Sequence, residues 1–210
     1  FCRTYGIRSA WSSPLISRHD QSLLGVFGMY YPDSRLPSAA DLELVDHMTH
    51  LATLAAERHR RDEERRRQAL EDALTGLGNR HQLQTRAGEL TARARQENQA
   101  LCLLFLDLDH FKQFNDNFGH LLGDKLLLEF SRQLKEALPN AQLLVRFGGD
   151  EFVAIVPDTL EQVSEQLQGL LHRLERDSVL VDQVRARLSF SCGVVDLADV
   201  NWNLGQAILQ

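Results

Sequence analysis

The segment LLVRFGGDEFVAIV, residues 143–156, constrains the fold more than any other part of the chain. Two apolar runs flank two glycines and two adjacent acids. Short apolar runs joined through glycine are typical of two strands and a tight turn, so the segment predicts a β-hairpin. A hairpin turn needs no pair of acids, and Asp150 and Glu151 therefore raise the question of what their carboxylates do.

The segments around this hairpin predict an α/β domain. In chain order they are a helix at 80–98, an apolar strand at 100–109, a polar, glycine-containing loop at 110–124, a helix at 125–138, the hairpin, a helix at about 159–176 and a strand at 187–195. Helix, strand, helix, two hairpin strands, helix and strand is the order of a ferredoxin-like α/β sheet.

Four acids fall at the ends of predicted strands. Asp107 and Asp109 end one strand, and Asp150 and Glu151 lie at the tip of the hairpin. In a βαββ unit these two places can lie at the same edge of the sheet, so we expect the carboxylates to converge. Mg²⁺ prefers such oxygen ligands. A Gly-Gly-Asp sequence alone is equally compatible with an ordinary turn.

Three blocks, RFGGDEF, DLDHFKQFNDNFGHLLGD and DALTGLGNR, together resemble one family in their order and spacing. Over about residues 70–210 the chain resembles the GGDEF family, the diguanylate cyclases. The resemblance implies a ferredoxin-like fold of the cyclase and polymerase-palm type. It also implies condensation of two GTP molecules into cyclic di-GMP with release of two pyrophosphates, in a homodimer whose two active-site edges face each other.

The resemblance further implies a metal site for Mg²⁺, with Mn²⁺ as a possible substitute. Its ligands are the carboxylates of Asp107 and Asp150 and the backbone carbonyl of Leu108. Glu151 is the further acid, near the attacking 3′-hydroxyl. Two such ions can hold the attacking and leaving oxygens of an in-line displacement. The residues implied in catalysis are Asp150, Glu151 and Lys112.

The resemblance also implies contacts with GTP, made by His110, Phe111, Asn115, Asp124, Gly148 and Gly149. Asn115 and Asp124 can pair with the edge of guanine, and residues 110–112 hold the β- and γ-phosphates through backbone N–H groups and the Lys112 ammonium. The two glycines let the backbone approach a bulky ligand. Each role has an alternative: Asn115 as a helix cap, Lys112 as a solvated side chain and Asp109 as a structural acid.

The chain departs from the family pattern in two places. Family members with product inhibition carry Arg-x-x-Asp upstream of the glycines, where this chain has Pro139 and Gln142. We therefore expect this inhibitory site to be absent. The family's closing helix, with its basic phosphate contacts, is expected just beyond Gln210. Because the chain opens at Phe1 without Met and closes inside a helical pattern, we expect it to be a fragment. Whether this fragment is itself catalytically active is left undecided by the sequence.

Residues 1–56 resemble the C-terminal part of a GAF domain, a sensor that often binds a small ligand. The resemblance is a pattern of strand (LLGVFGMYY, 23–31), Pro-bounded loop and exit helix. We expect this part to be joined by a helical signalling linker, residues 57–74, to a GGDEF domain over 75–210. The ligand of the GAF-like part stays unknown.

The helical pattern from Ala39 to about residue 74 changes character along its length. Leu44, Met48, Leu51 and Ala55 follow at spacings of 4, 3 and 4, like the seam of a two-helix coiled coil. The seam fades in the charge run ERHRRDEERRR, 57–67. Such a run is typical of a solvated helix face, and phosphate binding is the alternative.

Composition excludes several classes of function. A net charge of −6 opposes general binding to nucleic acid, which attracts basic faces. Three scattered cysteines and the lack of a long apolar run indicate a cytoplasmic protein without a membrane span in this sequence. The hypotheses are an active cyclase regulated by its GAF domain, a catalytically inactive GTP-binding or dimerising scaffold, and a signalling dimeriser that acts only through its helix.

Overall fold

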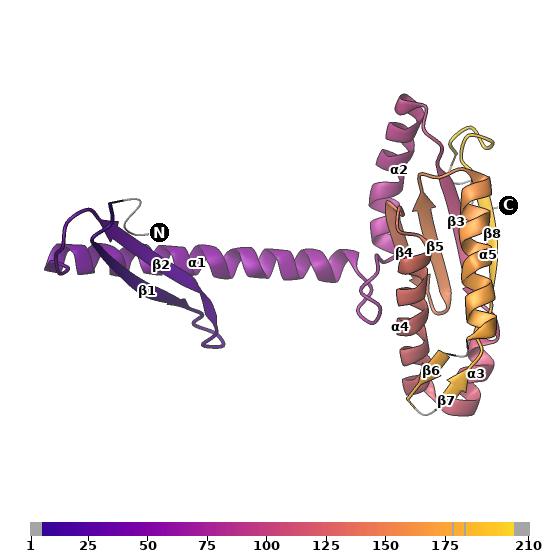
Figure 1. Cartoon of the computed structure of the whole chain (residues 1–210), viewed down its shortest axis with the longest axis horizontal. Helices are drawn as coiled ribbons and strands as arrows, with labels where there is room; N and C mark the ends of the chain where they lie inside the picture. The colour runs from indigo at the N-terminus through magenta and orange to yellow at the C-terminus, as the bar shows by residue number, and fades with distance from the viewer. Residues whose placement is uncertain (1–5, 178, 183, 204–210) are drawn as a thin grey trace. The chain divides into compact units, whose positions relative to one another are not determined.

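The computed structural model describes residues 6–177, 179–182 and 184–203 (Figure 1). The chain divides into two compact units, Phe1–Arg67 and Gln68–Gln210. The helical pattern expected around Gln210 lies outside the described residues. Among the described helices, none combines the length and the apolar character that a membrane span requires.

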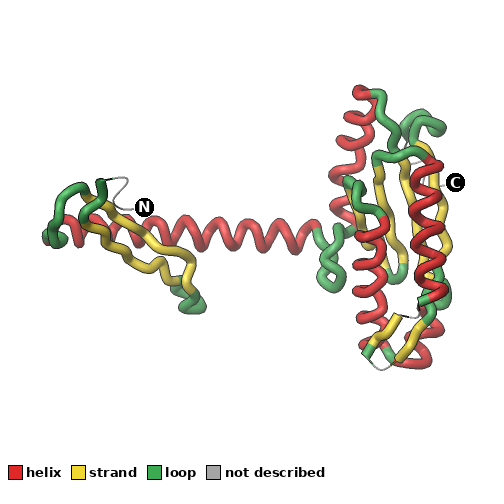
Figure 2. The backbone as a smooth tube through the Cα atoms, in the orientation of Figure 1, coloured by secondary structure: helices red, strands yellow, loops and turns green. Residues whose placement is uncertain are grey.

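The second unit is built on a four-stranded antiparallel sheet (Figure 2). Its strands are β3 (Cys102–Leu108), β4 (Leu143–Gly148), β5 (Glu151–Val156) and β8 (Phe190–Asp196), in the order β4-β5-β3-β8. The helices are α2 (Arg80–Glu97), α3 (Phe111–Phe118), α4 (His120–Ala137) and α5 (Leu160–Arg176). With β3 first in the chain but third in the sheet, this is the ferredoxin-like arrangement that the sequence predicts.

The sheet is covered on both faces, which explains why its strands are almost uniformly apolar. Successive side chains of a strand point to opposite faces. Leu104 and Leu106 of β3 therefore pack toward α4 and α5 in one buried cluster, whereas Leu103 packs toward α2 in a second. Figure 1 shows α4 and α5 over one side of the sheet. This two-sided burial holds the end of β3 in a fixed position.

The segment expected as a loop at 110–124 is instead helical. It forms all of α3 and the start of α4, and Gly119 separates the two helices with φ 85°. Phe111 and Phe114 pack against the buried cluster under α4, and this packing stabilises a helix that the polar composition does not indicate. A second small hairpin, β6 (Val179–Val181) and β7 (Val184–Ala186), was also not expected.

The first unit holds a two-stranded antiparallel sheet, β1 (Ser9–Ile16) and β2 (Leu23–Tyr31), followed by helix α1 (Ala39–Leu70). The sequence predicts β2 with these bounds, but β1 was missed because its serines and proline dilute the apolar pattern. Helix α1 begins after Ser38, whose hydroxyl accepts the N–H of Asp41 at 3.2 Å. This is a standard N-cap interaction.

Candidate active site

The acids at the end of β3 and at the tip of the β4–β5 hairpin lie side by side. Asp107 is the register partner of Glu151 on the neighbouring strand. The N–H of Leu108 donates to the carbonyl oxygen of Asp150 at 3.2 Å. The convergence expected from the strand order is therefore present, and it arises because β3 and β5 are antiparallel neighbours in the middle of the sheet.

The electrostatics of these acids indicate a site for a cation. Partial desolvation and the negative charges of Asp150 and Asp109 raise the pKa of the Asp107 carboxyl. Within the described ranges, no hydrogen-bond donor or basic side chain engages the carboxylates of Asp107, Asp150 or Glu151. Asp109 differs, because its Oδ1 accepts the hydroxyl of Ser191 at 2.8 Å. The Asp109 carboxylate therefore has a hydrogen-bond partner within the fold, while the other three carboxylates are free to interact with a ligand.

The donor set fits a hard divalent cation. Two carboxylates and a neighbouring backbone carbonyl supply only oxygen, and Mg²⁺ commonly takes one or two carboxylates and completes its shell with water and phosphate oxygens. No group of three or more acid, imidazole or thiol side chains suited to a metal occurs in the part of the chain that the structure describes. A cation at this position would therefore need further ligands from outside the described side chains, such as water or phosphate oxygens.

The hairpin turn itself is shaped by glycine. Gly149 has φ 51°, a left-handed conformation that costs other residues energy. A side chain at Gly148 would meet the Glu151 Oε2 atom at 3.9 Å, so that carboxylate lies directly over the turn. Both glycines are exposed. The turn consequently leaves bare backbone next to the acids.

Asn115 lies on α3 and packs against Gly123 of α4. A Cβ atom on Gly123 would come within 1.8 Å of Asn115 Oδ1, so the amide occupies the space that this glycine leaves. The same Oδ1 atom is buried without a hydrogen-bond partner in the described structure. Asp124, the next residue of α4, is exposed. Asn115 is not the N-cap of its helix, since His110 holds that position.

Residues 110–112 lead from β3 into α3. His110 has φ 60° and makes no side-chain cap hydrogen bond, while Phe111 is half-buried against the core. Lys112 is exposed and has no ion-pair partner among the described residues. The first N–H groups of a helix lack partners within the helix, so this turn presents free donors and one ammonium group.

Two residues that sequence reasoning missed hold the hairpin in place. Arg146 donates its Nε to the carbonyl oxygen of Gly149 at 2.9 Å and its Nη1 to Asp72 at 3.2 Å. The exposed fractions of the Arg146 and Asp72 side chains are 15% and 23%. Asp72 in turn accepts the N–H and the hydroxyl of Thr75. The acid of DALT and the arginine of RFGGDEF could have suggested this ion pair.

The DALTGLGNR segment also covers the edge of the sheet. Gly78 exchanges backbone hydrogen bonds with β4, donating to Leu144 at 3.0 Å and accepting from Arg146 at 2.9 Å. Asn79 donates to the carbonyl oxygens of Ala69 and Leu70 at the end of α1. The segment thus satisfies an otherwise open strand edge and a helix end, which explains why two glycines interrupt the helical pattern here.

The Asp72 ion pair predicts a pH-dependent stability. Burial opposes ionisation of Asp72, but the Thr75 donors and Arg146 outweigh it and lower the pKa from 3.8. A carboxyl with a lowered folded-state pKa stabilises the fold above its unfolded value and loses that contribution as the pH falls through the folded value. We expect Asp72→Asn to lower the free energy of unfolding by about 1–2 kcal/mol at neutral pH.

Urea unfolding at a series of pH values measures this difference. The gap between the unmodified protein and Asp72→Asn is expected to stay constant down to about pH 5 and to shrink below pH 3.8. Asp116→Asn, at an exposed position of α3 without a hydrogen bond in the described structure, serves as the control and should change little. A gap that is independent of pH would contradict the ion pair.

Comparisons with known proteins agree with this geometry. Residues 69–208 match the family model described as diguanylate cyclase, GGDEF domain. The chain is 44% identical over 109 residues to diguanylate cyclase DgcP of Pseudomonas aeruginosa, and the aligned segment covers 52% of this chain and 16% of that protein. It is 45% identical over 89 residues to diguanylate cyclase DgcS of Shewanella oneidensis, covering 42% and 30%. The chain therefore spans less than a third of either relative.

Solved structures show the same fold. The coiled coil and GGDEF domain of DgcB from Caulobacter crescentus align with a TM-score of 0.63 at 24% identity, over 76% of this chain and 83% of that one. A sensory box/GGDEF family protein from Caulobacter crescentus CB15 aligns with a TM-score of 0.54 at 33% identity, over 67% and 99%. The family model matches two thirds of the chain, and the fold agrees with these solved structures, so the chain belongs to the diguanylate cyclase GGDEF domain family.

Proposed function

We propose that the protein is a diguanylate cyclase that joins two GTP molecules into cyclic di-GMP and releases two pyrophosphates. The observation that carries the proposal is the meeting of Asp107, Asp150 and Glu151 at one edge of the sheet, where no basic side chain of the described residues pairs with their carboxylates. Such an arrangement is costly for the fold alone, because like charges repel, and it becomes favourable when cations and phosphates bind.

In this proposal each residue has a defined task. The carboxylates of Asp107 and Asp150 and the carbonyl of Leu108 hold Mg²⁺ or Mn²⁺. When bound, the metal supplies charge neutralisation at the phosphates. Glu151 lies next to Asp107 and acts near the attacking 3′-hydroxyl, while Lys112 and the N–H groups of residues 110–112 hold the β- and γ-phosphates. Gly148 and Gly149 leave room for the substrate beside the turn.

Guanine is assigned to Asn115 and Asp124. The Oδ1 of Asn115 has no hydrogen-bond partner in the described structure but is buried beside Gly123, so the amide must turn outward for the guanine N–H groups to reach it. The Asp124 carboxylate offers a second acceptor from the same helix pair. A buried acceptor without a partner is unfavourable, so a ligand donor at this point contributes to affinity.

Conversion of GTP to cyclic di-GMP by the purified protein with Mg²⁺ tests the proposal. If the protein is instead a catalytically inactive GTP-binding scaffold, we expect nucleotide binding without turnover. If it is a dimeriser that acts only through its helix, we expect neither GTP binding nor turnover. The charged site favours the cyclase over both, because neither alternative requires Asp107, Asp150 and Glu151 at one edge.

The packing of Asn115 on Gly123 predicts a selective loss of substrate binding. In Gly123→Ala the new methyl group meets Asn115 Oδ1, which must move. Alanine favours a helix over glycine by about 1 kcal/mol, so the fold should not be weakened. We expect weaker GTP binding by about tenfold, with unchanged or higher thermal stability, as one lost buried hydrogen bond implies.

Calorimetric GTP titration and thermal unfolding measure both quantities for Gly123→Ala. Gly169→Ala, within α5 where a Cβ meets nothing within 4 Å, provides a matched control for the helix effect. Unchanged GTP affinity in Gly123→Ala would remove Asn115 from the guanine site.

Product inhibition is expected to be weak. Pro139 and Gln142 cannot supply the arginine and aspartate of the family's inhibitory motif. The adjoining pocket of about 380 Å³ beside Asn140 is lined by three acids, Glu136, Asp158 and Glu165, and by one base, Arg173. The acids outnumber the base, and an excess of negative charge repels the phosphates of cyclic di-GMP. Added cyclic di-GMP should therefore raise the KM for GTP without lowering kcat, and a fall in kcat at saturating GTP would reveal a second site.

The proposal extends to regulation and assembly. The domain division into 1–56, 57–74 and 75–210, a GAF-like part with an unknown small ligand, and a cytoplasmic location all stay predictions. A homodimer is proposed because each domain holds one GTP. The seam residues Leu44, Met48 and Leu51 are exposed by 53%, 41% and 60%, so α1 offers them to a second copy.

A further inference from the structure

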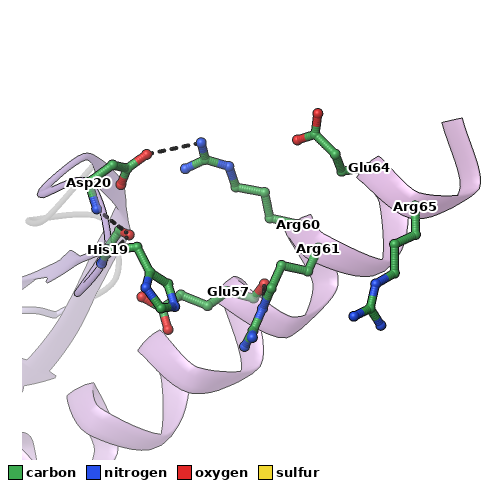
Figure 3. A pocket seen from close by; sticks show the side chains of 8 residues that line it. His19, Asp20, Glu57, Arg60, Arg61, Glu64 and Arg65 are labelled. Atoms are coloured by element: carbon green, nitrogen blue, oxygen red, sulfur yellow. Dashed lines mark hydrogen bonds and ion pairs between the residues drawn. The ribbon is translucent and has the colours of Figure 1, made fainter. Parts of the chain in front are cut away.

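A pocket of about 280 Å³ lies within the first unit, where the turn between β1 and β2 meets helix α1 (Figure 3). Ser17, His19 and Asp20 form one wall, and α1 residues between Glu57 and Arg65 form the other. Sequence patterning alone indicates a solvated face for this charge run. The turn converts part of that face into the wall of a pocket.

Both walls are fixed by buried or paired groups. Ser17 and Glu57 are only 3% and 6% exposed. Glu57 Oε1 accepts the backbone N–H of Arg18 at 2.8 Å, which ties the turn to the helix. Arg60 crosses the pocket mouth to Asp20 at 3.0 Å and to the hydroxyl of Ser22 at 3.1 Å. These contacts fix the two walls of the pocket, and Arg61 and Arg65 take no part in them.

Each acid of the pocket is already engaged. Hydrogen bonds from Ser22 and Ser17 and the interaction with Arg60 lower the pKa of Asp20. The Arg18 N–H lowers the pKa of Glu57 in spite of its burial. Glu64 pairs with Arg67, outside the pocket, at 3.3 Å. All three acids of the pocket therefore already have partners.

The basic side chains are not all engaged. The only hydrogen bond of Arg61 in the described structure runs from its Nε to the backbone carbonyl oxygen of Glu57 at 3.3 Å. The positive charges of Arg61 and His19 both attract the Glu57 carboxylate. Arg65 has no hydrogen bond or ion pair among the described residues. Figure 3 shows the guanidinium groups of Arg61 and Arg65 extending to the side of the helix where the His19 ring lies, whereas Arg60 and Glu64 point the other way.

We propose that this pocket binds a small phosphate-type oxyanion. Arg61 and Arg65 are four residues apart on a helix, so their side chains are neighbours on one face. Their free Nη groups present two planar donor forks, which match phosphate oxygens in pairs. The volume lies at the small end of ligand pockets, near roughly 300 Å³, and so favours a phosphate or phosphomonoester over a larger nucleotide. The proposal is independent of the cyclase assignment.

Titration of the protein with inorganic phosphate, in metal-free buffer at constant ionic strength, tests the site by calorimetry. We expect saturable binding that Arg61→Gln with Arg65→Gln weakens by about tenfold or more, because two charge-assisted donors are lost. The matched control is Arg58→Gln with Arg66→Gln, which removes the same charge from exposed positions of α1 outside the pocket. This control should change the affinity less than about twofold, as screened surface charges do.

Backbone amide NMR shifts locate the bound phosphate independently of any variant. The largest shifts are expected at Ser17–Asp20 and at Glu57–Arg65, and they should persist in Asp150→Ala, which separates this pocket from the candidate active site. Absence of saturable binding, equal weakening in both double variants, or shifts centred elsewhere would each overturn the proposal. Circular dichroism of the double variants confirms that α1 remains folded.

Discussion

Replacing Asp150 with alanine is expected to lower the rate of cyclic di-GMP formation by about a hundredfold or more. The variant removes one of the two carboxylates in the proposed metal site, the one whose negative charge acts on Asp107 at the end of β3. In the proposed metal site, the remaining acid and one backbone carbonyl would hold a divalent cation poorly, and the phosphates would lose the charge neutralisation that the metal supplies. A hundredfold corresponds to about 2.7 kcal/mol of activation free energy.

Asp109→Asn is the matched control for this prediction. Asp109 lies two residues from Asp107, but its carboxylate accepts a hydrogen bond from Ser191, which asparagine can also accept. This variant should keep most of the activity. Rates of both variants are measured as cyclic di-GMP formed from GTP with Mg²⁺, beside the unmodified protein. Retention of more than about a tenth of the rate by Asp150→Ala, a barrier change below ~1.4 kcal/mol, would contradict the metal assignment.

Leu51→Glu is expected to dissociate the proposed dimer and to lower cyclic di-GMP formation by about tenfold or more at equal protein concentration. Leu51 lies in the exposed apolar seam of α1, and a charged side chain in a coiled-coil seam loses its hydration without gaining a partner. In the proposed reaction each of two chains supplies one bound GTP, so separated chains would not complete it. Sedimentation velocity and the cyclase assay measure the two effects together.

The same helix offers a matched control. Leu42 is exposed by 56%, close to the 60% of Leu51, but it lies about 200° around the helix from the seam residue Leu44. Leu42→Glu should therefore leave both the mass in solution and the rate nearly unchanged. If Leu51→Glu sediments like the unmodified protein, the seam does not join two chains, and another surface must bring the GTP sites together.

Apolar runs and helical periodicity in the sequence were enough to predict the central sheet and most helices of the second unit. The strands at 102–108, 143–148 and 151–156 and helix α5 fall close to the predicted ranges. Strand and helix periods are local properties, and two-sided burial of the sheet makes its strands strongly apolar. The strand order made it possible for Asp107 to meet the hairpin acids at one edge, and the register of β3 with β5 pairs it with Glu151.

The sequence by itself thus determined the fold class, the family and the edge at which the acids gather. Only the tertiary structure decided that residues 111–118 are helical, that Asp72 holds Arg146, and that a turn encloses the charge run of α1. Each of these depends on contacts between segments far apart in the chain, 74 residues apart for the ion pair. A local pattern records which face of an element is apolar, but it does not record which distant side chain that face will meet.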